Sequence, residues 1–106
     1  MPTSQGTFRW TAPNLADAEF NVDGTFSRCD ITLNVPIPNF GKTSATLNYD
    51  DISQLSGTQF FDGHIGRVDF ETDFKNAPKI QGNLDTPIDK YIPVNGKGRW
   101  VEFFSD

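Results

Sequence analysis

The chain has 106 residues, the length of one domain (residues 1–106), and a chain of this size buries only roughly two-thirds of its unfolded surface. Its net charge of −5 argues against nucleic-acid binding, which needs a basic surface, and its single Cys excludes an internal disulfide and a cysteine-rich zinc site. Fourteen aromatic residues and 22 Val, Ile and Thr stand against ten Ala and Leu, a balance that favours strands over helices.

Alternating apolar and polar residues predict a series of short strands, because successive side chains of a strand point to opposite faces. In chain order the predicted strands cover residues 7–11, 19–22, 25–35, 43–49, 59–61, 65–75, 79–84, 91–94 and 97–104. Residues 50–55 predict a single helical turn between strands, ended by Gly57. The pattern predicts an all-β fold, a single small antiparallel β-barrel or β-sandwich of about eight strands with type I′ hairpins.

The stretch 65–75 has the clearest alternation in the chain. One face carries the apolar or uncharged residues Val68, Phe70, Thr72 and Phe74. The other face carries the charged residues Arg67, Asp69, Glu71, Asp73 and Lys75. Such a strand packs one face on a core and exposes the other to water.

Three dipeptides predict the positions of tight hairpins: Asp23-Gly24, Asp62-Gly63 and Asn95-Gly96. Asp-Gly and Asn-Gly supply the positive φ that both central residues of a type I′ turn need. Prolines punctuate the other strands. Pro36 and Pro38 are expected to end the strand 25–35, and Pro93 predicts an edge or bulged position, because Pro donates no backbone hydrogen bond.

The residues Arg67-Val68-Asp69-Phe70, Phe74 and Pro78-Lys79-Ile80 resemble the short strands of H-type lectin domains. In that family a strand that ends in Phe leads to a strand that begins with Pro and an apolar residue, within a small sandwich that trimerises. The resemblance covers residues 67–80, and the chain ends before the family's last strands. We carry over no sugar-binding residue from it and do not assign the chain to that family.

Aromatic residues provide the candidate binding surface. Adjacent pairs such as Phe60-Phe61 and Phe103-Phe104 send one ring to each face of a regular strand, and an exposed ring gives contact area at low entropic cost. The alternatives are burial on both sides, a subunit interface, or a ligand cavity lined with Phe. The candidate ligand-binding residues are Trp10, Phe61, His64, Tyr91, Trp100 and Phe104.

Groups that carry catalytic or metal chemistry are few. His64 is the single histidine, with Asp62 as its local candidate partner for acid–base catalysis, and a polar residue at a turn is the simpler interpretation. Cys29 shares a face with apolar neighbours and is expected to be buried and inert. The acidic residues at 50–51 and 69–73 predict solvated, partly paired carboxylates rather than a metal site. We assign no catalytic residue, metal or cofactor.

These observations favour a non-enzymatic binding module that holds a carbohydrate or a small apolar ligand against aromatic side chains. The alternative is a structural or interaction protein, such as an oligomer subunit, a viral or phage component or an inhibitor, with an aromatic face as the interface. Residues 1–10 lack the charged start and apolar stretch of a signal peptide, and no apolar run approaches the ~20 residues of a membrane span. The compartment stays open, with the cytoplasm favoured.

Overall fold

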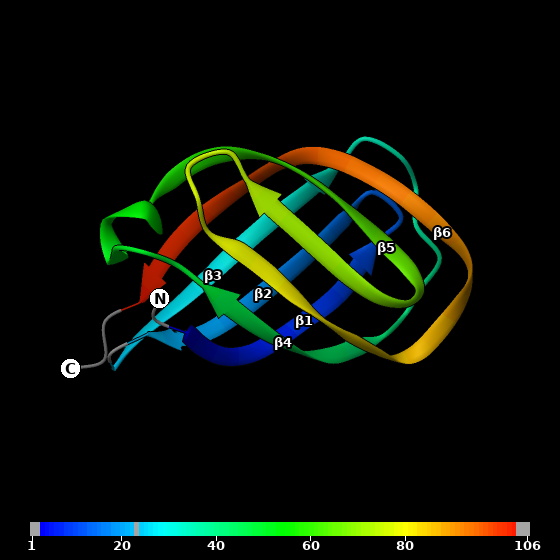
Figure 1. The fold of residues 1–106 in the computed structure, drawn as a ribbon, viewed down its shortest axis with the longest axis horizontal. Coiled ribbons are helices and arrows are strands. Elements are labelled where there is room, and N and C mark those ends of the chain that lie inside the picture. The colour runs from blue at the N-terminus through cyan, green and yellow to red at the C-terminus, as the bar shows by residue number, and fades with distance from the viewer. Residues whose placement is uncertain (1–2, 23, 104–106) are drawn as a thin grey trace.

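The computed structural model describes residues 3–22 and 24–103, which form one antiparallel sheet of six strands and no α-helix (Figure 1). The elements are β1 (Thr3–Ala12), β2 (Leu15–Val22), β3 (Thr25–Leu33), β4 (Lys42–Asn48), the 3₁₀ turn η1 (Ile52–Gln54), β5 (Gly57–Phe74) and β6 (Lys79–Phe103). The all-β prediction is confirmed. Among these described residues, no helix has the length and apolar character needed to cross a membrane.

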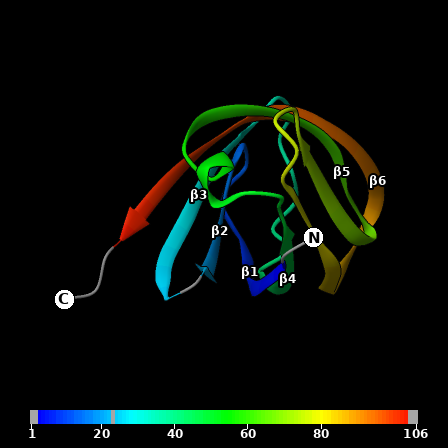
Figure 2. The same ribbon diagram turned by 60° about the vertical axis from the view of Figure 1, so that its left-hand side comes forward.

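The strand order is β3-β2-β1-β4-β6-β5, and β6 pairs with β3 as well. The first part of β6, residues 79–81, pairs with β4, and its last part, residues 96–103, pairs with β3. Figure 2 shows β6 arching from the β4 side of the sheet to the β3 side. This long strand therefore joins the two sides of the sheet that β1 and β2 separate.

β5 and β6 form one long antiparallel ribbon that folds back on itself at Gly66 (Figure 1). Residues 57–65 of β5 pair with 92–100 of β6, and residues 69–73 pair with 79–83. The register shifts between Ile65 and Arg67, across Gly66, and again between Arg67 and Asp69, and Gly66 has a φ of 96° that is accessible mainly to glycine. The two arms of β5 then meet, and the backbone N–H of Lys75 donates to the carbonyl of Phe60 at 2.9 Å.

This ribbon explains why the prediction of about eight strands is wrong. The expected strands 59–61 and 65–75 both belong to β5, and those expected at 79–84, 91–94 and from 97 onwards all belong to β6. β5 and β6 remain paired on both sides of their sharp bend, so each of these two strands includes several of the expected short strands.

Two of the three predicted hairpins are also wrong. Asp62-Gly63 lies inside β5 and Asn95-Gly96 lies inside β6, and Asp62 pairs with Asn95 across the two strands. Neither dipeptide therefore makes a turn. The hairpin predicted at positions 23 and 24 agrees in position, because β2 and β3 are joined there, with Val22 opposite Thr25. The residue at position 23 lies outside the described part of the chain, so the turn type stays a prediction.

The smaller expectations about strand ends fare better. β3 ends at Leu33, before Pro36, and Pro93 pairs only with the β5 side of the described sheet, opposite His64. The helical turn expected at 50–55 is η1, whose N-cap Asp51 accepts a hydrogen bond from the backbone N–H of Ser53 at 2.9 Å.

The core is built from stacked phenylalanine rings. Phe8 stacks between Phe40 and Phe70, with ring centroids 5.3 and 4.3 Å apart. Phe70 lies opposite Gly82, and a Cβ on Gly82 would lie 3.1 Å from the Phe70 ring, so this glycine leaves room for the ring on the neighbouring strand. Inward positions of every strand contribute to this core.

The alternation predicted for 65–75 holds for its second half only. Phe70, Thr72 and Phe74 are buried, whereas Val68 is 61% exposed. Register shifts around Arg67 displace Val68 from the inward phase, because the strand bends there.

We expect Gly96→Ala to lower the free energy of unfolding by about 1–3 kcal/mol, because overpacking of a tight site costs that much. A Cβ at Gly96 would lie 2.0 Å from the carbonyl oxygen of Thr32 on β3. The control is Gly41→Asn, at a site with φ of 80° and open space, since Asn tolerates this conformation. Urea unfolding measures both variants. Equal stability of Gly96→Ala and the native chain would contradict the close approach of β3 and β6.

Candidate functional site

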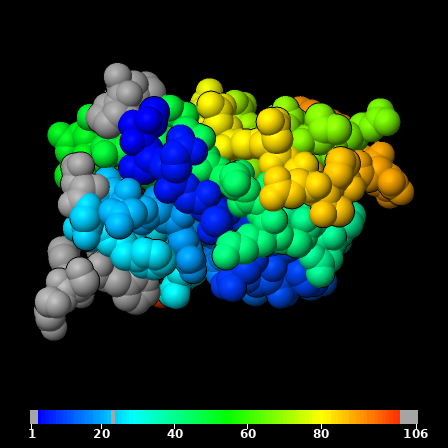
Figure 3. All heavy atoms as spheres, turned by 90° about the horizontal axis from the view of Figure 1, so that it is seen from below, coloured from blue at the N-terminus to red at the C-terminus, as the bar shows by residue number. Residues whose placement is uncertain are grey.

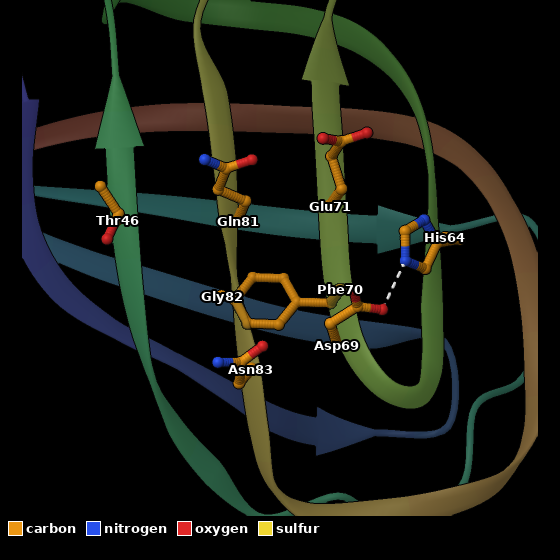
Figure 4. Close-up of a pocket in the computed structure, with 8 residues that line it drawn as sticks. All are labelled: Thr46, His64, Asp69, Phe70, Glu71, Gln81, Gly82 and Asn83. Carbon is orange, nitrogen blue, oxygen red and sulfur yellow. Dashed lines mark hydrogen bonds and ion pairs between the residues drawn. The ribbon is translucent and has the colours of Figure 1, made fainter.

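A surface cavity of about 300 Å³ lies where the folded ribbon meets β4 (Figure 4). We call it the polar cavity. Its lining residues come from three strands and are Thr46 from β4, His64, Asp69, Phe70 and Glu71 from β5, and Gln81, Gly82 and Asn83 from β6. Six of these eight residues carry polar side chains, so the cavity is suited to hydrogen bonding.

Strand register brings these polar side chains together. Asp69 lies opposite Asn83, Glu71 opposite Gln81, and Thr46 on the other side of Gln81. Within each strand, the residues that alternate with these polar ones point into the core, as Phe70 does between Asp69 and Glu71, because strand side chains alternate between faces. The polar rows of β4, β5 and β6 therefore form one continuous face of the sheet.

The fold-back at Gly66 places His64 on one arm of β5 beside Asp69 on the other (Figure 4). His64 Nε2 lies 2.9 Å from Asp69 Oδ1, so the Nε2–H tautomer donates to this carboxylate. The ring of Tyr91 stacks on the imidazole ring of His64 at a centroid distance of 4.8 Å, and Tyr91 is 60% exposed. A polar pair that lines the cavity thus lies next to an accessible ring, which is not itself part of the lining.

The candidate pair of His64 with Asp62 is wrong. Asp62 forms an ion pair with Lys75, across the two arms of β5, whereas His64 contacts Asp69. The fold-back decides this choice, because it brings a residue five positions away closer to the imidazole than a near neighbour in sequence.

The acidic side chains beside the cavity are already engaged. Lys79 Nζ lies 3.4 Å from Glu71 and 3.5 Å from Asp73. The charges of Asp73 and then Glu71 raise the pKa of Lys79, which keeps the ammonium group protonated. Within residues 3–22 and 24–103, no group of three or more His, Cys, Asp or Glu side chains is arranged to hold a metal ion.

Among the predicted ligand-binding residues, the structure brings His64 and Tyr91 together. Phe61 and Trp100 are buried in the core and both contact the ring of Phe74, at centroid distances of 5.4 and 5.7 Å. The other two candidates lie elsewhere: Trp10 packs against the core and donates from Nε1 to the carbonyl of Ile37 at 2.8 Å, and Phe104 is outside the described residues.

The sequence-based candidates omit Thr46, Gln81 and Asn83, which line the polar cavity. A signal for them exists, because all three fall on the polar phase of predicted strands, 43–49 and 79–84. Pairing those strands with 65–75 would have placed the three side chains beside its charged face. The candidates chosen from the sequence were mostly aromatic, so these three polar side chains were not among them.

Comparison with protein-family models, curated proteins and solved structures finds no significant match to this chain. The resemblance of residues 67–80 to H-type lectin domains therefore receives no support from these comparisons. Any statement about function rests on the geometry of the chain itself.

Cys29 is fully buried on β3, as its place on the apolar face predicts. Burial first, and then the charge of Asp30, raise the pKa of its thiol. Gly98 packs directly against its sulfur atom, since a Cβ there would lie 2.6 Å from Sγ. Cys29 therefore belongs to the core.

We expect the native protein to resist alkylation of Cys29 by iodoacetamide at neutral pH, because the reactive thiolate is neither formed nor accessible. The same reagent should label Cys29 fully in concentrated urea, which is the control for reagent activity. Mass spectrometry measures the added group. Rapid labelling of the folded chain would contradict the placement of Cys29 in the core.

Proposed function

We propose that this chain is a non-enzymatic binding module that holds a neutral carbohydrate in the polar cavity between β4, β5 and β6. The observation that carries the proposal is the composition of the lining, in which amide, carboxylate, hydroxyl and imidazole groups from three strands converge on about 300 Å³. Sites for small molecules are concave and place a few polar groups to fix orientation.

The lining chemistry matches hydroxyl groups. The amides of Gln81 and Asn83 both donate and accept hydrogen bonds, whereas the carboxylates of Asp69 and Glu71 accept them. A sugar hydroxyl group donates and accepts, so it satisfies either kind of partner. None of the eight described lining residues is Lys or Arg, which disfavours phosphate or carboxylate ligands.

The same lining favours a carbohydrate over the small apolar ligand also expected from the sequence. The Phe rings that would hold an apolar ligand instead stack on one another, as Phe8 does with Phe40 and Phe70. Tyr91 supplies an exposed ring next to His64, and an aromatic ring suits the apolar face of a sugar.

The alternative function, a structural or interaction protein with an aromatic interface, has weaker support. Two of its rings, Phe61 and Trp100, are buried in the core. Phe60 is 65% exposed and remains the ring best placed to contact a partner protein. An exposed single ring is common on protein surfaces, so it favours an interface less than the converging polar groups favour a ligand.

A closed sheet would hold this cavity rigidly, and we extend the proposal to a small barrel. Its support is the pairing of β6 with β4 at one end and with β3 at the other. A ring of β3, β2, β1, β4 and β6 would leave none of these five strands with a free edge, and β5 pairs with β6 alongside that ring.

We expect the protein to bind neutral glycans in preference to acidic ones on a glycan array. Gln81→Ala removes an amide with two hydrogen-bonding groups and is expected to weaken the best neutral glycan about tenfold. Isothermal titration calorimetry measures the change.

The matched control is Gln59→Ala, whose amide donates to the carbonyl of Ser56 at 3.3 Å and lies outside the cavity lining. It should leave the affinity unchanged. An array with no bound neutral glycan, or with binding concentrated on acidic glycans, would refute the proposed function.

A further inference from the structure

A second cavity, of about 410 Å³, adjoins the polar cavity on the same face of the sheet. It is lined by Asn48 of β4, Ala77 of the turn before β6, and Lys79 and Gln81 of β6. Gln81 lines both cavities, so its side chain stands at their junction. The two hollows therefore adjoin at Gln81, and we call them together the groove.

The groove follows the start of β6. Lys79, Gln81 and Asn83 occupy alternate positions of this strand, with buried Ile80 between the first two. The four residue-to-residue steps from Lys79 to Asn83 span about 14 Å of extended chain, which is longer than a single sugar ring. Figure 3 shows the start of β6 (yellow) on the surface beside β4 (green), the strand that supplies Thr46 and Asn48 to the groove.

The far end of the groove is held in a fixed shape. Ala77 has φ of 105°, a conformation that residues other than glycine rarely adopt. Its backbone N–H donates to the carbonyl of Phe74 at 3.1 Å, and Asn76 Nδ2 donates to the carbonyl of Gln54 at 3.0 Å. Backbone strain of this kind persists where the surroundings hold it, and it is common at ligand sites.

The side walls of the groove carry balanced charge. Lys79 lies between Glu71 and Asp73, so a cation and two carboxylates offer donors and acceptors side by side. Asn48 adds an amide directly opposite Lys79. The second cavity thus continues the mixed donor and acceptor lining of the polar cavity rather than changing its chemistry.

We propose that the groove binds several consecutive units of a neutral oligosaccharide chain, with one unit in the polar cavity and the next units beside Asn48 and Lys79. This inference rests on the proposed function and defines its ligand as an extended chain rather than a single terminal sugar.

The test uses calorimetry with three neutral ladders, the cello-, manno- and chito-oligosaccharides, each from the monosaccharide to the hexasaccharide. We expect affinity to rise about tenfold or more with chain length as new hydrogen bonds form in the second cavity. Asn48→Ala should remove this rise and leave the affinity for the monosaccharide unchanged. Asn83→Ala, a change of the same type in the polar cavity, should weaken every length.

The outcomes separate the two proposals. Equal affinity at all lengths, with Asn83→Ala weakening each of them, would overturn the extended groove and retain the polar cavity as a sugar site. An Asn48→Ala variant that keeps the full rise with length would overturn the extended groove as well. Absence of binding to every ladder and to the neutral glycans of the array would overturn both proposals. Thermal unfolding of both variants checks that each is folded.

Discussion

The fold-back of the β5–β6 ribbon at Gly66 is the constraint on which the rest of the structure depends. A Cβ at this position would lie 2.1 Å from the carbonyl oxygen of Lys90, and the residue has φ of 96°, so both space and conformation require glycine. Because the ribbon doubles over, the two arms of β5 face each other. The interior contact of Phe61 with Phe74 and the surface contact of His64 with Asp69 both follow from this one bend.

In the core, the packing of the Phe rings depends on glycine in the facing strand. A chain this short fills its interior with few large residues, and Phe rings fit only where the facing strand contributes little volume. Gly82 opposite Phe70 gives that room, since a Cβ there would lie 3.1 Å from the Phe70 ring, and both residues also line the polar cavity. The same residue thus links core packing to the shape of the proposed sugar site.

Local patterning predicted much of this fold and less of the site. The alternation around Phe70 and the apolar face of Cys29 correctly predicted buried residues, because burial in a strand follows a period of two. The Asp62-Gly63 and Asn95-Gly96 dipeptides misled, because glycine serves close backbone approach as well as turns. The His64–Asp69 contact and the alignment of Gln81 with Glu71 arise from long-range register, which no short stretch of sequence specifies.

We propose above all that the polar face of β4, β5 and β6 holds a sugar chain. The most direct measurement is a titration of ¹⁵N-labelled protein with the neutral oligosaccharide ladders, followed by amide chemical shifts. We predict that the shifts cluster at Thr46, Asn48, His64 and residues 69–71 and 79–83. A separate cavity of about 230 Å³, lined in part by Thr32, Lys97 and Arg99, lies over β3 and the end of β6 and should stay unperturbed. Shifts centred on this 230 Å³ cavity, or no shifts at all, would contradict a sugar site on the face of β4, β5 and β6.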